Sequence, residues 1–238
     1  SLYIALLFAS FDILLVYLLL CRIKEEFLPL LSYKNIILLL LFFAFGTTHY
    51  YVGTLGSVWH VDQMVSSFFG TLGIYIIFKK KRSTVDYVLS VISFGVALMG
   101  RATIVLLVLV PAILFVWDNA GMFFRRGFLN KFLVLRKGVL IFVLPLGLFC
   151  SWFFYYNFAR FNNPFEYGYR HIHESEYLAQ LRLTHGIMSL STIPRNVWFM
   201  LFEIPHISYN KGIKFDINLN GNSIFFLTPP FLAAFLAI

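Results

Sequence analysis

The stretch LYIALLFASFDILLVYLLLC, residues 2–21, contains a single charged side chain, Asp12. A helix needs about 20 consecutive apolar residues to cross the hydrocarbon core of a bilayer. This stretch therefore predicts a membrane-spanning helix with one carboxylate deep inside it. Asp12 is the main ionisable residue expected deep in a span, and a polar residue there could simply form a hydrogen bond within a helix bundle.

The composition of the whole chain agrees with this interpretation. The 238 residues are 60% hydrophobic and 13% charged, whereas soluble domains carry about 25% charged residues. The net charge of +8 does not indicate nucleic-acid binding, because no basic patch has the arrangement that phosphate contacts require. Cys21 and Cys150 both lie in apolar segments, so we expect them to be packing residues.

Apolar windows outside the first stretch predict further spans. The sequence therefore predicts an all-α integral membrane protein, which forms a polytopic helical bundle of about seven spans in a single domain. The predicted spans lie near 2–21, 36–52, 63–78, 85–99, 102–117, 138–156 and 223–238.

Charged residues sort the connectors of this topology into two sides. Three connectors, within 22–34, 79–82 and 118–138, carry 12 of the 19 Lys and Arg residues and fall on one side. The positive-inside rule makes that side cytoplasmic. All six histidines and several acidic residues fall on the other side, where we expect any chemistry to occur.

The windows 85–99 and 102–117 predict a short hairpin with Arg101 at its external tip. One long helix through Arg101 is the alternative, but it would place basic connectors on opposite faces, against the positive-inside rule. A charge slightly below the interface either grips an anionic group or extends to the lipid headgroups.

Residues 157–222 form a long external segment, which begins with the polar and aromatic stretch NFARFNNPFEYGYRHIHESE. Within it, STIPRNVWFMLFEIPHI (191–207) predicts an interfacial helix, capped by Ser191 or Thr192 and with Pro194 in its first turn. We expect Trp152 and the nearby tyrosines to form an interfacial aromatic belt.

Four segments resemble the GT-C class of membrane glycosyltransferases, among them the protein-O-mannosyltransferase-like and lipid A aminoarabinose transferase-like proteins. They are GSVWHVDQMVSSFF (56–69), FGVALMGRATIVLLVLVPAIL (94–114), YYNFARFNNPFEYGYRH (155–171) and GNSIFFLTPPFL (221–232). The motif at 155–171 is the most specific, and the order of the four along the chain also agrees.

This resemblance implies a multi-pass enzyme of a bacterial plasma (inner) membrane. Such an enzyme moves a sugar from a polyprenyl-phosphate carrier to an acceptor at the external face. The family places its catalytic carboxylate in the loop after the first span, and no residue of this chain matches it. We therefore expect a fragment that lacks the catalytic loop and is inactive alone.

The chemistry of this transfer suggests two groups of site residues. Arginines can stabilise the leaving phosphate, and the candidates for lipid-phosphate binding are Arg101, Arg170, Arg160 and Arg195. The candidates for acceptor or sugar contact are His60, Asp62, Glu166 and Tyr169.

Several of these residues have structural alternatives. Arg160 could pair with Glu166, and Glu166 could shape its loop rather than act as a base. Asp62 could cap a helix N-terminus. His171 and His173 lack a clear third ligand, so a divalent metal is only weakly supported and no cofactor is assigned. A membrane transporter and a non-catalytic, lipid-binding membrane subunit remain the alternative functions.

Overall fold

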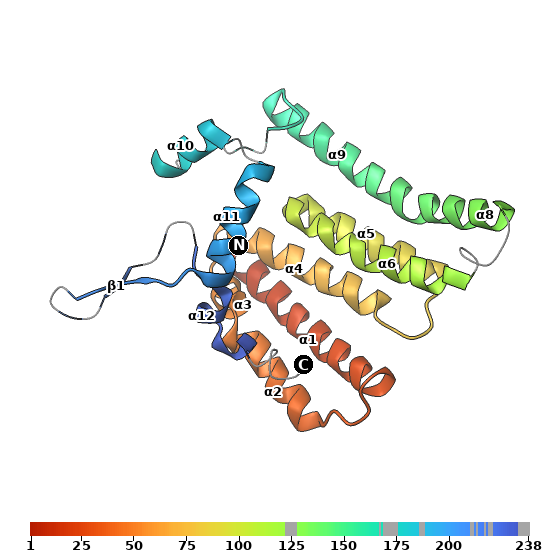
Figure 1. The fold of residues 1–238 in the computed structure, drawn as a ribbon, viewed down its shortest axis with the longest axis horizontal. Helices are drawn as coiled ribbons and strands as arrows, with labels where there is room; N and C mark the ends of the chain where they lie inside the picture. The colour runs from red at the N-terminus through yellow and green to blue at the C-terminus, as the bar shows by residue number, and fades with distance from the viewer. Residues whose placement is uncertain are drawn as a thin grey trace. The chain divides into compact units, whose positions relative to one another are not determined.

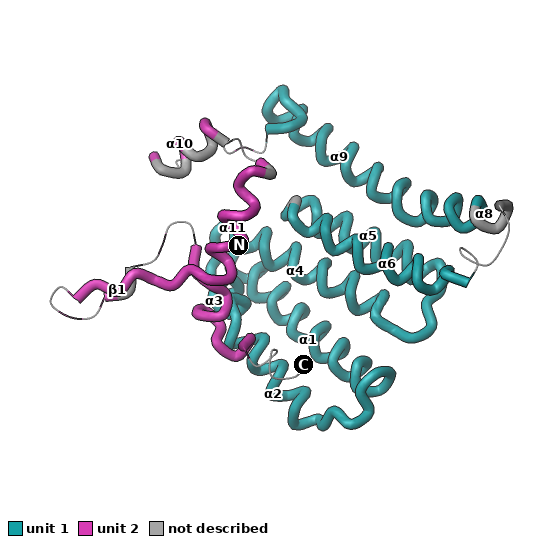
Figure 2. The backbone as a smooth tube through the Cα atoms, viewed as in Figure 1, with its two compact units in different colours: residues 1–167 teal, residues 168–238 magenta. Residues whose placement is uncertain are grey.

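The computed structural model describes residues 1–121, 128–166, 168, 176–185, 189–209, 212, 214–216, 218 and 221–232. The chain divides into two compact units, residues 1–167 and 168–238 (Figure 2), and each is described by itself. Helices dominate the described residues, as the all-α prediction expected. The described strands, β1 (His206–Ser208) and β2 (Lys214–Asp216), form one antiparallel pair.

Unit 1 is an array of helices joined by short connections (Figure 1). Its elements are α1 (Leu2–Glu26), α2 (Tyr33–Gly46), α3 (Thr48–Thr54), α4 (Val58–Ile77), α5 (Thr84–Gly100), the 3-10 helix η1 (Ala102–Val108), α6 (Leu109–Asp118), α8 (Phe128–Gly138), the π-helical turn η2 (Val139–Val143) and α9 (Leu144–Phe161).

Contacts between distant residues show that successive passes of unit 1 alternate in direction. The Ser1 hydroxyl donates to the Gly56 carbonyl just before α4, while the Lys80 amide after α4 donates to Glu26 at the end of α1. The Tyr87 hydroxyl in the first turn of α5 donates to Asp118 at the end of α6, over 2.6 Å. The hairpin predicted around Arg101 is therefore present.

Within the described residues, two helices are long and apolar enough to cross a membrane: Leu2–Glu26 and the continuous helix Phe132–Phe161. They contain the predicted spans 2–21 and 138–156. The predicted span 36–52 is broken instead, because α2 and α3 meet at 53°, and they count as a third span only if taken together. Helix α5 and the helical stretch Thr103–Asp118 are shorter apolar helices.

Two predicted boundaries differ from the structure or lie partly outside it. Helix α9 continues to Phe161, so the external segment predicted from residue 157 starts inside a helix. Of the predicted span 223–238, the structure describes α12 (Ile224–Leu227) and the residues up to 232. Seven spans remain a prediction.

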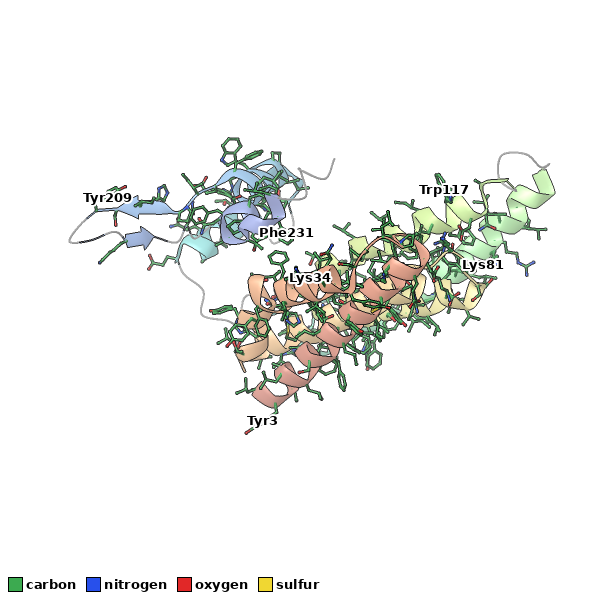
Figure 3. The ribbon with its side chains drawn as sticks, turned by 90° about the horizontal axis from the view of Figure 1, so that it is seen from below. Tyr3, Lys34, Lys81, Trp117, Tyr209 and Phe231 are labelled. Carbon is green, nitrogen blue, oxygen red and sulfur yellow. The ribbon has the colours of Figure 1, made fainter. Side chains whose placement is uncertain are left out.

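The basic connectors of unit 1 meet at one end of the array. The Arg82 guanidinium donates to both Asp118 carboxylate oxygens, over 2.8 and 2.7 Å, and Lys79 pairs with Asp86 over 2.7 Å. Arg22 stacks on the Tyr75 ring at 3.8 Å. Figure 3 shows Lys81 and Trp117 at this end and Tyr3 at the other. Arg22, Lys79 and Arg82 of the first two basic connectors therefore lie at one end of unit 1, as the sequence predicted.

His49 departs from the predicted sorting of the histidines. His49 was expected on the external face, yet it is 6% exposed and its Nε2 lies 3.5 Å from Asp12 Oδ2. The break after Gly46 explains the difference. Helix α2 has 14 residues, or about 21 Å at 1.5 Å per residue, so α3 begins level with Asp12 of α1. Asp12 also accepts a hydrogen bond from Ser67 at 2.6 Å, so it does not stand alone.

Unit 2 contains α10 (Glu176–His185), the 3-10 turn η4 (Leu190–Thr192), α11 (Ile193–Phe202) and α12 beside its strand pair. The Ser223 amide and hydroxyl bind the carbonyls of Glu203 and Leu201, which ties the start of α12 to the end of α11. Helix α11 has Pro in its first turn and exposes Val197, Trp198 and Phe202. These exposed apolar side chains are compatible with the predicted interfacial helix.

Glycines allow the helices of unit 1 to approach closely. The Phe149 ring of α9 lies directly over Gly95 of α5, where a Cβ atom would clash with it. Similarly, the Phe94 ring lies over Gly73 of α4, and the Ser90 hydroxyl donates to the Gly73 carbonyl at 2.9 Å.

We predict that Gly95→Ala destabilises the protein by about 1–3 kcal/mol, because its methyl group must displace the Phe149 ring. The measurement is thermal unfolding in detergent. Gly147→Ala on α9 is the matched control, since nothing lies within 4 Å of a Cβ there. Equal effects from both substitutions would contradict the close packing of α5 and α9.

The Arg82–Asp118 pair predicts a dependence of stability on pH. Its hydrogen bonds lower the pKa of Asp118, which lies just outside the predicted span 102–117. The stabilisation is therefore present above the unfolded pKa of about 3.9 and is lost as the pH falls through the folded pKa.

We expect Asp118→Asn to lower the free energy of unfolding by about 1–2 kcal/mol at neutral pH. This difference from wild type should disappear as the pH falls below about 4 and Asp118 becomes protonated. Chemical unfolding at several pH values measures it. Glu25→Gln, at an exposed position near the end of α1, serves as the control and should leave stability unchanged at each pH.

Candidate functional site

Arg101 lies where the chain turns at the end opposite the basic connectors. It follows the last residue of α5 and has an extended backbone, with φ −136° and ψ 104°. Its amide donates to the Ala97 carbonyl and its carbonyl accepts from Ile104, each over 3.0 Å. The chain then continues as a seven-residue 3-10 helix, longer than the three or four residues such helices usually reach.

Asp62 and Ser66 approach this turn from α4. Their four-residue spacing places both side chains on one face of the helix. That face meets Gly100, where an added Cβ atom would lie 2.5 Å from Asp62 Oδ1 and also against Ser66 Oγ. The absence of a side chain at Gly100 therefore lets the Asp62 carboxylate reach the residue next to Arg101.

The polar atoms of this cluster are incompletely satisfied. Arg101 Nε and Ser66 Oγ are buried and have no hydrogen-bond partner within the described part of the chain. Buried polar groups in proteins are normally paired, so both atoms are available to a ligand. Burial raises the pKa of Asp62, which lies one residue outside the predicted span 63–78, and the Arg101 charge offsets part of this rise.

His60 lies on α4, two residues before Asp62. Its Nδ1 is hydrogen-bonded to the Ser57 hydroxyl, and its ring packs edge-on against Tyr51 at 6.1 Å. Ser57 is the N-cap residue of α4, so Asp62 lies inside the helix. The alternative in which Asp62 caps the helix N-terminus is therefore wrong.

Arg160 lies in the last turn of α9 and Glu166 follows that helix. The continuous helix of η2 and α9 runs parallel to α5, because Phe142 packs on Tyr87 and Phe149 on Gly95. The Arg160 guanidinium is exposed and lies over the rings of Tyr156 and Phe161, at 5.3 and 4.9 Å. The ion pair between Arg160 and Glu166 is not found among the described residues.

Glu166 is 6% exposed and ends a shaped loop. The loop starts at Asn162 in the left-handed region, with φ 54°. The Glu166 amide donates to the Asn163 carbonyl at 3.2 Å, and the buried Asn157 side chain donates to the Pro164 carbonyl at 3.4 Å. This burial favours the role of Glu166 as part of the loop scaffold.

The other predicted site residues lie in unit 2 or outside the described residues. Arg195 is exposed on α11 of unit 2, and Arg170 and Tyr169 lie outside the described residues, as do His171 and His173. Within the described ranges, no group of three or more His, Cys, Asp or Glu residues could hold a metal ion.

Comparisons with known proteins found no matching family, no similar curated sequence and no similar solved structure. The site is therefore characterised by its own geometry.

Ser66 is the member of this cluster that the sequence analysis missed. Its signal was its position four residues after Asp62, which makes the two side chains neighbours on one helix face. The second signal was Gly100 immediately before Arg101, a small residue that allows another helix to approach.

We predict that Asp62 and Arg101 are energetically coupled. In a double-mutant cycle with Asp62→Ala and Arg101→Ala, the coupling energy should be about 1 kcal/mol, within the range for neighbouring charged groups. Thermal unfolding in detergent measures it. The matched cycle pairs Asp62→Ala with Arg160→Ala and should be additive; equal coupling in both cycles would show that the effect is not local.

Proposed function

We propose that this chain belongs to a membrane glycosyltransferase that takes a sugar from a polyprenyl-phosphate donor and transfers it at the external face. In this proposal, the cluster of Asp62, Ser66 and Arg101 holds the donor phosphate and a hydroxyl of the sugar or acceptor. The proposal includes the seven-span topology, with Arg101 on the outside of a bacterial plasma (inner) membrane.

The observation that supports the proposal is an unpaired hydrogen-bond donor on the Arg101 side chain. Its Nε is buried and has no partner among the described residues, yet an arginine side chain presents five N–H donors in a rigid fork. A phosphate group offers several oxygens that match this fork, and hydrogen bonds between ionised groups are about twice as strong as neutral ones. A lipid phosphate would satisfy the unpaired donor.

Asp62 and Ser66 complement this cation with polar oxygens. A carboxylate beside the phosphate repels it, which argues against a direct contact between the two. Asp62 is instead suited to accept a hydrogen bond from a hydroxyl of the sugar or acceptor. Ser66 Oγ, buried and unpaired within the described chain, can both donate and accept.

An apolar cavity of unit 1 suits the lipid part of the donor. It has a volume of about 780 Å³ and lies between α5 and α9. Its lining includes Val88, Ile92, Met99, Leu144, Leu148 and Trp152. Met99 is two residues before Arg101, so an isoprenoid chain in this cavity would bring its phosphate toward the guanidinium.

The test is binding of a polyprenyl phosphate to the full chain in lipid nanodiscs, measured by native mass spectrometry. We expect Arg101→Ala to weaken binding about 10–100-fold, because hydrogen bonds to charged groups contribute about 1.5–3 kcal/mol. Arg101→Lys should recover part of the affinity, since it restores the charge without the planar fork.

Arg160→Ala is the matched control, because the other described arginine candidate of unit 1 is exposed, stacks on the Tyr156 and Phe161 rings and donates to the Tyr156 hydroxyl, so its donors are not buried as that of Arg101 is. Unchanged affinity in Arg101→Ala would refute the proposed phosphate site. Transfer from a labelled polyprenyl-phosphate sugar tests the reaction itself. Suppose that the lipid binds in an Arg101-dependent way while no sugar is transferred, even in a longer chain that includes the carboxylate loop of the family. That result would favour a non-catalytic lipid-binding subunit.

A further inference from the structure

A second polar cluster lies in the interior of unit 1 and has no role in the proposed transfer. Asp12 of α1, His49 of α3 and Ser67 of α4 form it. The Ser67 hydroxyl donates to Asp12 Oδ2 at 2.6 Å, and His49 Nε2 lies 3.5 Å from the same oxygen. Three helices far apart in the sequence thus converge on one carboxylate.

The surroundings of this cluster are apolar. Asp12 is 0% exposed, and it is ten residues from the start of α1, or about 15 Å along the helix. On one side, Ala5, Ala9 and Met64 form a buried core with Phe8, Val52 and Val61 around it. The His49 ring packs on Phe43 with ring centroids 4.6 Å apart. The Asp12 side chain therefore has no solvent-accessible surface in this arrangement.

Two atoms of the cluster lack partners. Asp12 Oδ1 and His49 Nε2 are both buried without a hydrogen bond to any described residue. A buried charge without compensation costs several kcal/mol, so a bare carboxylate beside a neutral imidazole is unfavourable here. One proton shared by the two groups makes the pair neutral overall, whether it resides on the carboxylate or on the imidazole.

Other ionisable groups do not provide this compensation in the described structure. Helix α2 has no ionisable side chain between Asn35 and Gly46, and Tyr50 and Tyr51 on α3 are exposed. On α4, Asp62 is directed to Gly100 and His60 to Ser57. Asp12 and His49 are therefore left to neutralise each other.

We propose that Asp12 and His49 form a proton-binding site in the interior of unit 1, which holds one proton between Asp12 and Nε2 of His49, with Ser67 as a fixed donor to Oδ2. The ligand of this site is a proton. The proposal does not depend on the phosphate site, because the two clusters share no residue.

The site also connects a proton to a movable element. His49 is the second residue of α3, which meets α2 at 53°, so the pair fastens this short helix to α1. Removal of the proton leaves a buried negative charge, which needs water or another cation. Proton exchange is therefore expected to require α3 to move away from α1 and admit water.

The first experiment determines where protons reside in the wild-type chain. The chain is labelled with ¹³C-aspartate and ¹⁵N-histidine, placed in nanodiscs with choline as the only added cation, and examined by solid-state NMR near neutral pH. We expect either a protonated Asp12 with a neutral His49 or an ionised Asp12 with an imidazolium at His49. An ionised Asp12 beside a neutral His49 overturns the proposal.

Variants give an independent readout. We expect His49→Gln to lower the unfolding temperature, and Asp12→Asn combined with His49→Gln to recover most of that loss, because the double variant has no buried charge to compensate. Ser10→Ala, at an exposed serine of the same helix, should have no effect. Additive losses in the double variant overturn the proposal.

The same preparation separates a proton from a metal cation. Exchange of choline for sodium or lithium should leave the unfolding temperature of wild type unchanged. Stabilisation by either ion that disappears in Asp12→Asn would show that the site binds a metal cation instead, and would overturn the assignment of a proton. None of these readouts involves Arg101, so failure here and failure of the proposed phosphate site are distinguishable.

Discussion

The close contact between α4 and α5 is the constraint on which most of unit 1 depends. Two residues without side chains make it possible: Gly73 receives the Phe94 ring, and Gly100 receives Asp62 and Ser66. In apolar surroundings, association of helices depends on van der Waals packing and close backbone approach rather than on the hydrophobic effect. The same contact that joins the helices also brings a carboxylate beside Arg101.

The two ends of unit 1 use charge differently. At one end, Arg82, Asp118 and their neighbours satisfy one another through short hydrogen bonds, so the charges there stabilise the helix connections. At the other end, Arg101 keeps a buried donor without a partner among the described residues. Paired charges stabilise the fold, whereas an unpaired buried donor is available to a ligand. This contrast places the candidate site at the Arg101 end of unit 1.

Periodicity and charge predicted much of unit 1, because long apolar runs and basic connectors are local features of the sequence. The helix at 2–21 and the turn at Arg101 follow from them. The burial of His49 could not be predicted in this way, since it depends on where α2 ends relative to Asp12 of another helix. Likewise, the contact of Asp62 with Gly100 joins residues of two helices, and only the three-dimensional packing reveals Ser66 as its neighbour. Arg170 and Tyr169 lie outside the described residues, and their predicted roles stay predictions.

The break between α2 and α3 has a consequence for biogenesis. Insertion of Asp at the centre of a helix costs about 2.5–3.5 kcal/mol, while each Leu, Ile, Phe or Val returns about 0.3–0.6 kcal/mol. Helix α1 is long and apolar enough to cross a bilayer, but its Asp12 carboxylate finds its partners only on α3 and α4, which are synthesised later. Because the break after Gly46 sets the level at which His49 meets Asp12, compensation of this insertion cost depends on the packing of α1, α3 and α4 together.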